Sequence, residues 1–314
     1  MIKLQECVHE SRRSAGKTAA GTPRFRCNGC GKRFVDKSKK LLGNMRIDAK
    51  HAMMAVDMLL EGMSVRATAR LTGLDTGTIT DLILVVGDKC QNFMDKTIVN
   101  VKALDIQMDE IWSFVGKKQK RVRLNDKPGV GDSWTYICID RDTKLVLAHY
   151  VGRRDQTDTN NFLDKVRRAV NTDYRIHVST DGWAAYRYGV PFTLGSNIDY
   201  GTLVKQYANQ QEVTRYSPAQ IIRAEKKAVF GNPDPDRICT SHIESFNQKY
   251  RQHIKRFGRL TNAHSKSLDH HEAMQSIYMA HYNFCRIHNS LGKQTPAMAA
   301  GISDHKMTIQ QLLN

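Results

Sequence analysis

The stretch IQMDEIWSF, residues 106–114, holds two adjacent carboxylates, Asp109 and Glu110, inside an apolar segment. An apolar run of this length predicts a buried β-strand. Successive side chains of a strand point to opposite faces of its sheet. We therefore expect these two carboxylates to face opposite sides of a sheet, so that only one of them faces a shared site.

The segments that follow predict the rest of a sheet. The expected strands are 134–139, 145–151 and 174–178. A hairpin-like loop at 140–143 joins the first two, and an amphipathic helix at 158–170 precedes the third. Three antiparallel strands, a helix and another strand are, in this order, typical of a ribonuclease-H-like fold. We expect an α+β multidomain protein with a mixed sheet of this kind and flanking helices.

The later part of the chain gives an uneven pattern. Between 187 and 240 we expect irregular structure, with some helix near 218–228. From Ser241 apolar residues recur at steps of three and four, which predicts a helix with one packed side. Its polar face carries Glu244, Gln248, Arg251 and Lys255. A long C-terminal helix is expected at about 266–289.

Charge is the most informative feature of the composition. The 314 residues include 48 Lys and Arg against 31 Asp and Glu, a net charge of +17. Such an excess attracts polyanions, usually nucleic acid, although a merely basic soluble protein is the alternative. No apolar run approaches the ~20 residues of a membrane helix, and the first residues lack the apolar core of a signal peptide. We therefore expect a cytoplasmic protein whose seven cysteines form no disulfide framework.

The first 50 residues hold 13 basic and 4 acidic side chains and few aliphatic ones. A segment with too few apolar residues to form a hydrophobic core needs other stabilisation, such as a bound metal ion. The C-x-x-C pair at 27–30 is typical of a zinc knuckle, and the alternative is a partly degenerate zinc ribbon. The candidate Zn²⁺ ligands are Cys7, His9, Cys27 and Cys30. Lys32 and Arg33, which follow directly, are expected to bind phosphates.

A helical region follows. Ser64 and Asp75 are typical N-cap residues, and Gly73 lies between the helices that they begin. We expect helices from about 47 to Gly62, at 65–71, and from 76 to about 86. A helix, a short glycine turn and a helix form the helix-turn-helix layout, although a helical hairpin used as a spacer has the same pattern. Thr76 and Thr78 on the last helix are expected to reach DNA.

Three carboxylates stand out in this arrangement. Asp109 and Asp181 are each expected where a strand meets a site, and Glu244 lies on the polar face of the helix after 241. Cutting or joining phosphodiesters commonly uses two divalent cations about 3.5–4 Å apart. Mg²⁺ prefers oxygen ligands, so a few carboxylates suffice to hold it. Isolated acidic residues are common, so their spacing alone is a weak signal.

The sequence motifs that contain these carboxylates are a more specific signal than their spacing. MDEIWSFVG (108–116), TDGWAAY (180–186) and HIESFNQKYR (242–251) resemble the three catalytic motifs of bacterial insertion-sequence transposases of the IS-one family. KRFGRLT (255–261) and YNFCRIH (282–288) match that family as well. The resemblance covers nearly the whole chain. It implies a DDE transposase with a ribonuclease-H-like catalytic core, which cleaves DNA at the inverted ends of an element and transfers the strands.

The resemblance also assigns residues. It implies that Asp109, Asp181 and Glu244 hold two Mg²⁺ or Mn²⁺ ions. Glu110 is a rival for the first position, but it should face the other side of its strand. Asn247 and Arg251 are expected to contact DNA or to support the metal ligands. Phosphate contacts are expected from Lys255, Arg256 and Arg259.

The implied partners are double-stranded DNA, as element ends and target, and further copies of the chain. We expect a dimer or larger assembly, since joining two ends requires both to be held, in the cytoplasm and at the nucleoid of a bacterium. A catalytically silent or domesticated DNA-binding regulator on the same fold is the alternative, and a nuclease or integrase is a third. The expected parts are a zinc-knuckle segment at 1–44, a helix-turn-helix at 45–98, the catalytic domain at 99–260 and a helical extension at 261–314.

Two further features carry expectations. The link at 117–132 looks longer than the family's usual one and is expected to be an extra loop that touches DNA. Three tryptophans lie near the carboxylates, and they either stack on flipped bases or belong to the core. They are Trp112, Trp134 and Trp183.

Overall fold

The structure is a computed structural model that describes residues 11–17, 23–35, 41–207, 221–258 and 262–313. Cys7, His9 and Arg259 lie outside the described residues, so their expected roles stay predictions. Within the described residues, none of the helices is both long enough and apolar enough to cross a membrane.

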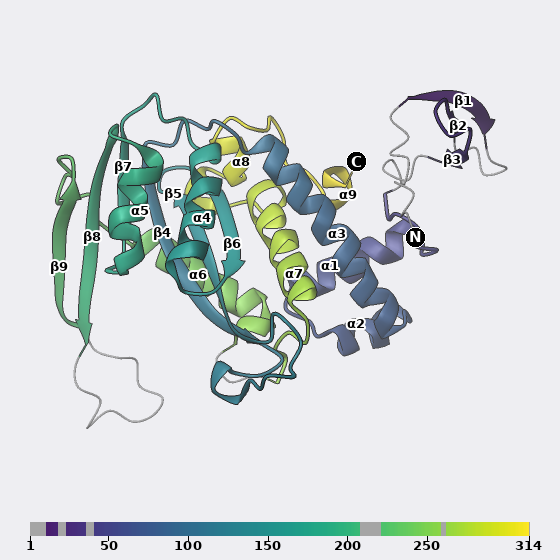
Figure 1. Cartoon of the computed structure of the whole chain (residues 1–314), viewed down its shortest axis with the longest axis horizontal. Coiled ribbons are helices and arrows are strands. Elements are labelled where there is room, and N and C mark those ends of the chain that lie inside the picture. The colour runs from purple at the N-terminus through teal and green to yellow at the C-terminus, as the bar shows by residue number, and fades with distance from the viewer. Residues whose placement is uncertain (1–10, 18–22, 36–40, 208–220, 259–261, 314) are drawn as a thin grey trace, which may run out of the picture.

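A six-stranded sheet in the order β6-β5-β4-β7-β8-β9 forms the centre of the molecule (Figure 1). β4 is antiparallel to β5, and β5 to β6, while β4, β7 and β8 run parallel and β9 returns antiparallel to β8. The predicted mixed sheet is therefore confirmed, with β4 in its interior. The strands are β4 Asp105–Val115, β5 Gly131–Asp140, β6 Val146–Gly152, β7 Ile176–Thr180, β8 Ile198–Tyr207 and β9 Ile221–Phe230.

Helices cover both faces of this sheet. On one face lie α4 Gln156–Ala169 and α5 Ala184–Leu194, and Phe162 of α4 stacks on Tyr136 of β5 (Figure 1). On the other face lie α6 Ser241–His253 and α7 Leu268–Ala280, and His271 of α7 hydrogen-bonds to Ser113 of β4. Odd-numbered side chains of β4 thus meet α6 and α7, and even-numbered ones meet α4 and α5.

Three helices precede the central sheet in the described part of the chain. They are α1 Ala49–Leu60, α2 Val65–Thr72 and α3 Thr76–Thr97. The longest of them, α3, packs along α7. The predicted caps are confirmed: the Ser64 and Asp75 side chains accept hydrogen bonds from the next helix, and Gly73 adopts φ 72° in the turn between α2 and α3. Helix α3 extends well beyond the expected end near 86, because its buried stripe continues along α7. A Cβ at Gly87 would lie 2.5 Å from Cβ of Ala273, so glycine permits this close approach.

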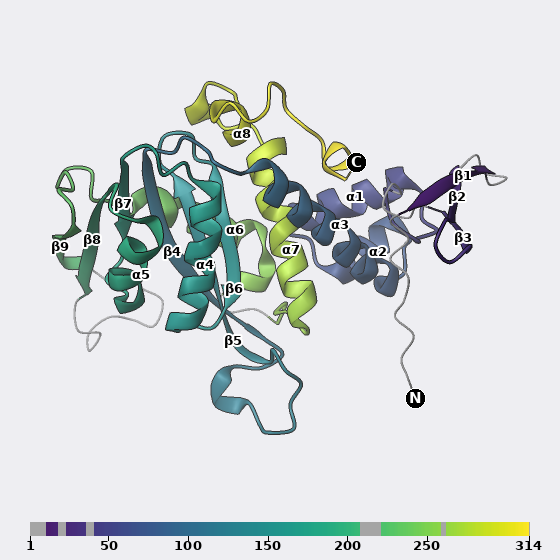
Figure 2. The same cartoon turned by 45° about the horizontal axis from the view of Figure 1, so that its top comes forward.

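A small antiparallel sheet precedes these helices. Its strands are β1 Arg12–Lys17, β2 Pro23–Cys27 and β3 Arg33–Val35, in the order β1-β2-β3. In Figures 1 and 2 this sheet lies at the opposite end of the molecule from β9.

The expectation for 187–240 was wrong for the described residues up to Phe230 and correct for 231–240, which contain no helix or strand. Instead of irregular structure with helix near 218–228, the described residues before 231 form the end of α5 and the long strands β8 and β9. The β9 sequence IIRAEKKAVF is rich in Ala, Glu and Lys, which favour helix locally. Pairing with β8 overrides that preference. Lys226 and Lys227 lie on what is then an edge strand, where lysine is common.

The predicted C-terminal helix is confirmed over most of its length. Helix α7 continues into a π-helical turn, His281–Cys285, and then ends. Within that turn, the Asn283 carboxamide pairs with both N and O of Val146 on the edge strand β6. Short elements complete the chain, namely η6 Asn289–Leu291, α8 Pro296–Ala299 and α9 Ile309–Leu312.

Candidate active site

The two adjacent carboxylates of β4 lie at the centre of the sheet and on opposite faces. Asp109 Oδ2 accepts a hydrogen bond from Nδ2 of Asn247 on α6, at 2.8 Å. Glu110 Oε1 accepts from Nε of Arg154 at 2.6 Å, and its Oε2 accepts from the Tyr186 hydroxyl of α5 at 3.3 Å. The alternation that the strand pattern predicted is therefore confirmed by the partners of each side chain.

Asp181 reaches the same place from the end of β7. The parallel register pairs Met108 with Thr180, so the residue after Thr180 emerges beside Asp109. Asp181 Oδ1 accepts a hydrogen bond from the backbone N–H of Trp183, 2.9 Å away, at the start of α5. This bond anchors the carboxylate at the carboxyl end of its strand, where sites of open sheets commonly lie.

Asp109, Glu110 and Asp181 form a compact group. Each offers one carboxylate oxygen, and these three oxygens lie within 4.8 Å of one another. The donor set is composed of hard oxygen ligands, which suits Mg²⁺ or Mn²⁺. Beside them, Oδ1 of Asn247 is buried and has no hydrogen-bond partner among the described residues. An unpaired buried acceptor is costly, and a water bound to a metal ion would satisfy it.

The negative charges of these three carboxylates repel one another. Burial, reinforced by the negative charges of Asp181 and Glu244, raises the pKa of Asp109 to about 7. Burial, reinforced by Asp181 and Asp109, raises the pKa of Glu110 to about 8. Burial also raises the pKa of Asp181. Like charges held this close favour protonation or a bound cation, so the site is electrostatically suited to a divalent metal.

Glu244 faces the group from the first turn of α6. It lines a pocket of about 490 Å³ together with Asp109, Glu110 and Asn247. Its Oε1 accepts a hydrogen bond from Thr240 at 2.6 Å and forms an ion pair with Lys205 of β8. Glu244 is thus at the site, but it is not one of the three carboxylates that lie within 4.8 Å of one another.

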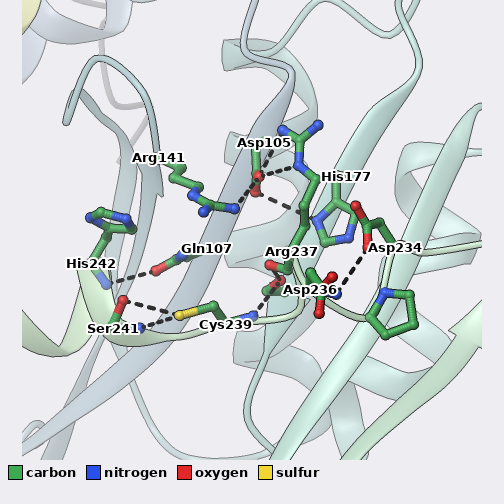
Figure 3. A network of polar contacts seen from close by, with 12 residues as sticks. Asp105, Gln107, Arg141, His177, Asp234, Asp236, Arg237, Cys239, Ser241 and His242 are labelled. Atoms are coloured by element: carbon green, nitrogen blue, oxygen red, sulfur yellow. Dashed lines mark hydrogen bonds and ion pairs between the residues drawn. The ribbon is translucent and has the colours of Figure 1, made fainter.

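A buried polar network fixes the position of α6 (Figure 3). The Gln107 carboxamide oxygen accepts from the N–H groups of His242 and Ile243, at 3.0 and 3.1 Å. It thereby satisfies the start of a helix whose N-cap, Thr240, makes no side-chain cap bond. Because Gln107 and Asp109 both belong to β4, one strand carries the first carboxylate and also holds the helix that carries Glu244.

The second part of the network holds the segment that leads into α6. Asp105 is fully buried, and its Oδ2 accepts from Arg237 at 2.9 and 3.0 Å and from Arg141 at 3.1 Å (Figure 3). Burial alone would raise the pKa of Asp105, but His177 and Arg237 outweigh it and lower the pKa. No sequence pattern predicts this network, because Asp105 and Arg237 are far apart in the chain and neither belongs to a motif.

Strand alternation predicts that Glu110 faces away from the site. Its direction was predicted correctly, but Asp181 follows the end of its strand and so meets side chains from both faces. The signal that could have shown this is the length of the two strands: β4 continues past Asp109 where β7 ends at Thr180.

The residues expected on DNA occupy varied positions. Arg251 donates from Nη1 to the Phe257 carbonyl at 3.1 Å, and Arg256 donates from Nη1 to the His270 carbonyl at 3.0 Å. Lys255 is exposed. The two arginines therefore brace the segment after α6, and Lys255 presents its charge to solvent.

The N-terminal candidates are also placed. Lys32, Arg33 and Thr76 are exposed, and Thr78 is half-buried on α3. Cys27 and Cys30 flank the turn after β2, where the Cys30 N–H lies 3.5 Å from Sγ of Cys27. The zinc site stays a prediction, since its two upstream ligands lie outside the described residues.

Comparison with known proteins finds relatives by sequence and likenesses among solved structures. No family model matches the chain. Over 173 residues, 55% of the chain, it is 24% identical to InsB of insertion element IS1 from Escherichia coli K12, of which this covers 72%. The IS1 InsB protein of Shigella flexneri matches with the same identity and is 92% covered. The chain is thus similar to proteins of insertion elements.

Among solved structures, the chain resembles a Mos1 transposase paired-end complex and a piggyBac transposase synaptic complex with hairpin DNA. The Mos1 likeness has a TM-score of 0.21 at 12% identity and covers 48% of this chain and 58% of that one. The piggyBac likeness has a TM-score of 0.36 at 11% identity and covers 83% and 71%. TM-scores this low carry no argument about fold or function.

Proposed function

We propose that the protein is a DNA transposase of the DDE type. It binds the inverted ends of an insertion sequence and catalyses metal-dependent cleavage and strand transfer, with Asp109, Asp181 and Glu244 as the catalytic carboxylates. The observation that carries this proposal is their convergence: Asp109 has Asp181 beside it and shares a pocket with Glu244. The similarity to InsB of IS1 supports the same assignment.

Each side chain has a role in this proposal. Asp109 and Asp181 hold Mg²⁺ or Mn²⁺ from two neighbouring strands, and Glu244 contributes from α6 across the pocket. Divalent cations supply activation of the attacking water or 3′-hydroxyl and stabilisation of the leaving oxygen. Asn247 fixes the Asp109 carboxylate through its 2.8 Å hydrogen bond.

In this proposal DNA is held by basic and polar side chains, of which Arg251 and Arg256 also brace the segment after α6. The full set is Lys32, Arg33, Thr76, Thr78, Arg251, Lys255, Arg256 and Arg259. Such contacts are largely independent of sequence and weaken as salt rises. The N-terminal segment gains rigidity from Zn²⁺ bound by Cys7, His9, Cys27 and Cys30. The protein acts on paired DNA ends as a dimer or larger assembly, in the cytoplasm and at the nucleoid of a bacterium.

A strand-transfer assay tests the proposal. Purified protein is mixed with labelled DNA that carries the element's own end and with Mg²⁺. We expect joined products from the wild type and none from Glu244→Gln, with end binding retained by both. Glu61→Gln is a matched control, since Glu61 is an exposed glutamate at the end of α1. End binding with no cleavage by the wild type, in Mg²⁺ or Mn²⁺, would instead indicate a silent DNA-binding regulator.

A further inference from the structure

Arg154 lies in the short segment between β6 and α4, with its guanidinium between two tryptophan rings. Its Cζ atom is 4.9 Å from the ring centroid of Trp134 on β5 and 4.2 Å from that of Trp183, the N-cap of α5. Cations are attracted to aromatic faces, and a planar guanidinium also stacks on them. The two rings therefore fix the position of the Arg154 guanidinium and also stabilise its positive charge.

The guanidinium faces two carboxylates of the candidate site. Its Nε and Nη2 each lie 2.6 Å from Oε1 of Glu110, and Nη2 lies 3.6 Å from Oδ2 of Asp181. The Glu110 side chain is only 1% exposed, so Arg154 takes the place that water would have beside an exposed carboxylate. A guanidinium presents several N–H donors in one rigid plane, which lets a single side chain hold both carboxylates.

Glu110 is otherwise well placed to bind metal. One of its oxygens lies within 4.8 Å of the ligand oxygens of Asp109 and Asp181. Yet its two oxygens are taken by Arg154 and by the Tyr186 hydroxyl, both on the α4 and α5 side of the sheet. Arg154 thus binds a carboxylate that lines the same pocket as Asp109 and Glu244 and that would otherwise be available to a metal ion.

We propose that Arg154 is a positioning residue, which keeps Glu110 out of the metal site and orients Asp181 toward Asp109. The inference rests on the proposed function, because it takes Asp109 and Asp181 as metal ligands. Without Arg154, Glu110 becomes an additional oxygen donor beside the bound ion. The metal is then held more tightly, but in a different arrangement of ligands.

Mn²⁺ binding to the DNA-free full chain, measured by calorimetry, tests this without reference to activity. Arg154→Gln removes a positive charge from the site and releases the Glu110 carboxylate. Both changes favour binding of Mn²⁺, so the affinity should rise about 10-fold. Adding Glu110→Gln to that variant should return the affinity to near the wild-type value. Arg154→Lys keeps the positive charge but lacks the planar guanidinium, so its Mn²⁺ affinity should lie between those of the wild type and Arg154→Gln.

Two controls separate the explanations. Arg167→Gln removes one positive charge from an exposed position on α4 and should leave Mn²⁺ affinity unchanged. Thermal unfolding of every variant shows whether it is folded. If Arg154→Gln is not folded, the Mn²⁺ affinity of Arg154→Lys is compared with that of the wild type instead.

The outcomes distinguish this inference from the proposed function. Unchanged Mn²⁺ affinity in a folded Arg154→Gln, or a rise that persists after Glu110→Gln is added, would overturn the positioning role. An equal rise in Arg167→Gln would do the same, because it would be a general effect of charge. If Asp109→Asn binds Mn²⁺ as well as the wild type does, Asp109 does not hold the ion, and the proposed function fails.

Discussion

The carboxamide of Asn247 donates a hydrogen bond to Asp109 across 2.8 Å, which joins helix α6 to the central strand β4. The other carboxamide atom, Oδ1, is buried without a partner among the described residues. One side chain therefore connects the helix that carries Glu244 to the first carboxylate, and it keeps an acceptor available at the candidate metal position.

This contact gives a first prediction. Asn247→Ala should lower strand transfer by about 10-fold or more, because Asp109 loses the partner that orients it. Binding of the DNA end should change little. Ser245→Ala, an exposed position on the same helix, is the matched control. Equal rates in Asn247→Ala and the wild type would show that the hydrogen bond has no part in the reaction.

Gln107 gives a second prediction. Gln107→Ala removes the acceptor for the first N–H groups of α6, so the free energy of unfolding should fall by about 1 kcal/mol, as for loss of a helix cap. Since α6 carries Glu244, strand transfer should fall more than end binding does. Chemical denaturation and the two assays check this. A variant with unchanged stability would show that α6 does not depend on Gln107.

The raised pKa values give a third prediction. A carboxyl group whose folded pKa lies above its unfolded value contributes stability at low pH, which is lost as the pH rises through the folded pKa. Asp109, with a pKa of about 7 against 3.8, should therefore destabilise the metal-free protein between about pH 4 and 7. Compared with the wild type, Asp109→Asn should lose less stability as the pH rises.

Thermal unfolding in the presence and absence of Mg²⁺ measures this effect. Mg²⁺ should stabilise the wild type more at pH 8 than at pH 5, and Asp109→Asn should abolish most of the difference. Parallel stability curves for the two proteins over this range would contradict the proposed coupling.

The pKa of Asp105 is shifted in the opposite direction from that of Asp109, and this gives a fourth prediction. The folded pKa of Asp105 is lowered, so its contribution to stability is present above its unfolded pKa of 3.8 and is lost as the pH falls through the folded value. Asp105→Asn leaves two partly exposed arginines without their shared carboxylate, which should lower the free energy of unfolding by about 2 kcal/mol at pH 7. The deficit relative to the wild type should shrink as the solution is acidified below about pH 4. A deficit that does not depend on pH would contradict this assignment.

The segment between β4 and β5 gives a fifth prediction. Figure 2 shows it extending away from the sheet, and it carries exposed basic side chains that include Lys120 and Arg121. Arg153 braces its base by donating to the Val130 and Asp132 carbonyls. If the segment touches DNA, Lys120→Gln with Arg121→Gln should weaken end binding and reduce the slope of log affinity against log salt by about one per lost phosphate contact. An unchanged salt dependence would exclude it from the DNA interface.

The sequence predicted the parts of the fold that rest on local pattern. The apolar segment around Asp109, the hairpin that follows it and the capped helices all have periodic apolar residues or N-cap residues, so they could be recognised one at a time. The β9 strand could not, because its Ala, Glu and Lys favour helix until β8 pairs with it.

The candidate site shows the same division. Asp109, Asp181 and Glu244 were found because each lies in a distinctive motif. Arg154 lies in a loop without periodicity, and its importance depends on Trp134, Trp183 and Glu110, which only the folded chain brings around it. Contacts between distant segments are set by sheet order, which the predicted elements did not specify.

Metal rescue at Asp181 tests the central claim most directly. A thiolate is a poor ligand for Mg²⁺ and a better one for the softer Mn²⁺. Cleavage of labelled end DNA is therefore measured with the wild type and Asp181→Cys, each in Mg²⁺ and in Mn²⁺. We expect the wild type to cleave in both, and Asp181→Cys to be inactive in Mg²⁺ and to recover activity in Mn²⁺. Equal activity of Asp181→Cys and the wild type in Mg²⁺ would contradict a metal-binding role for Asp181 and, with it, the proposed DDE mechanism.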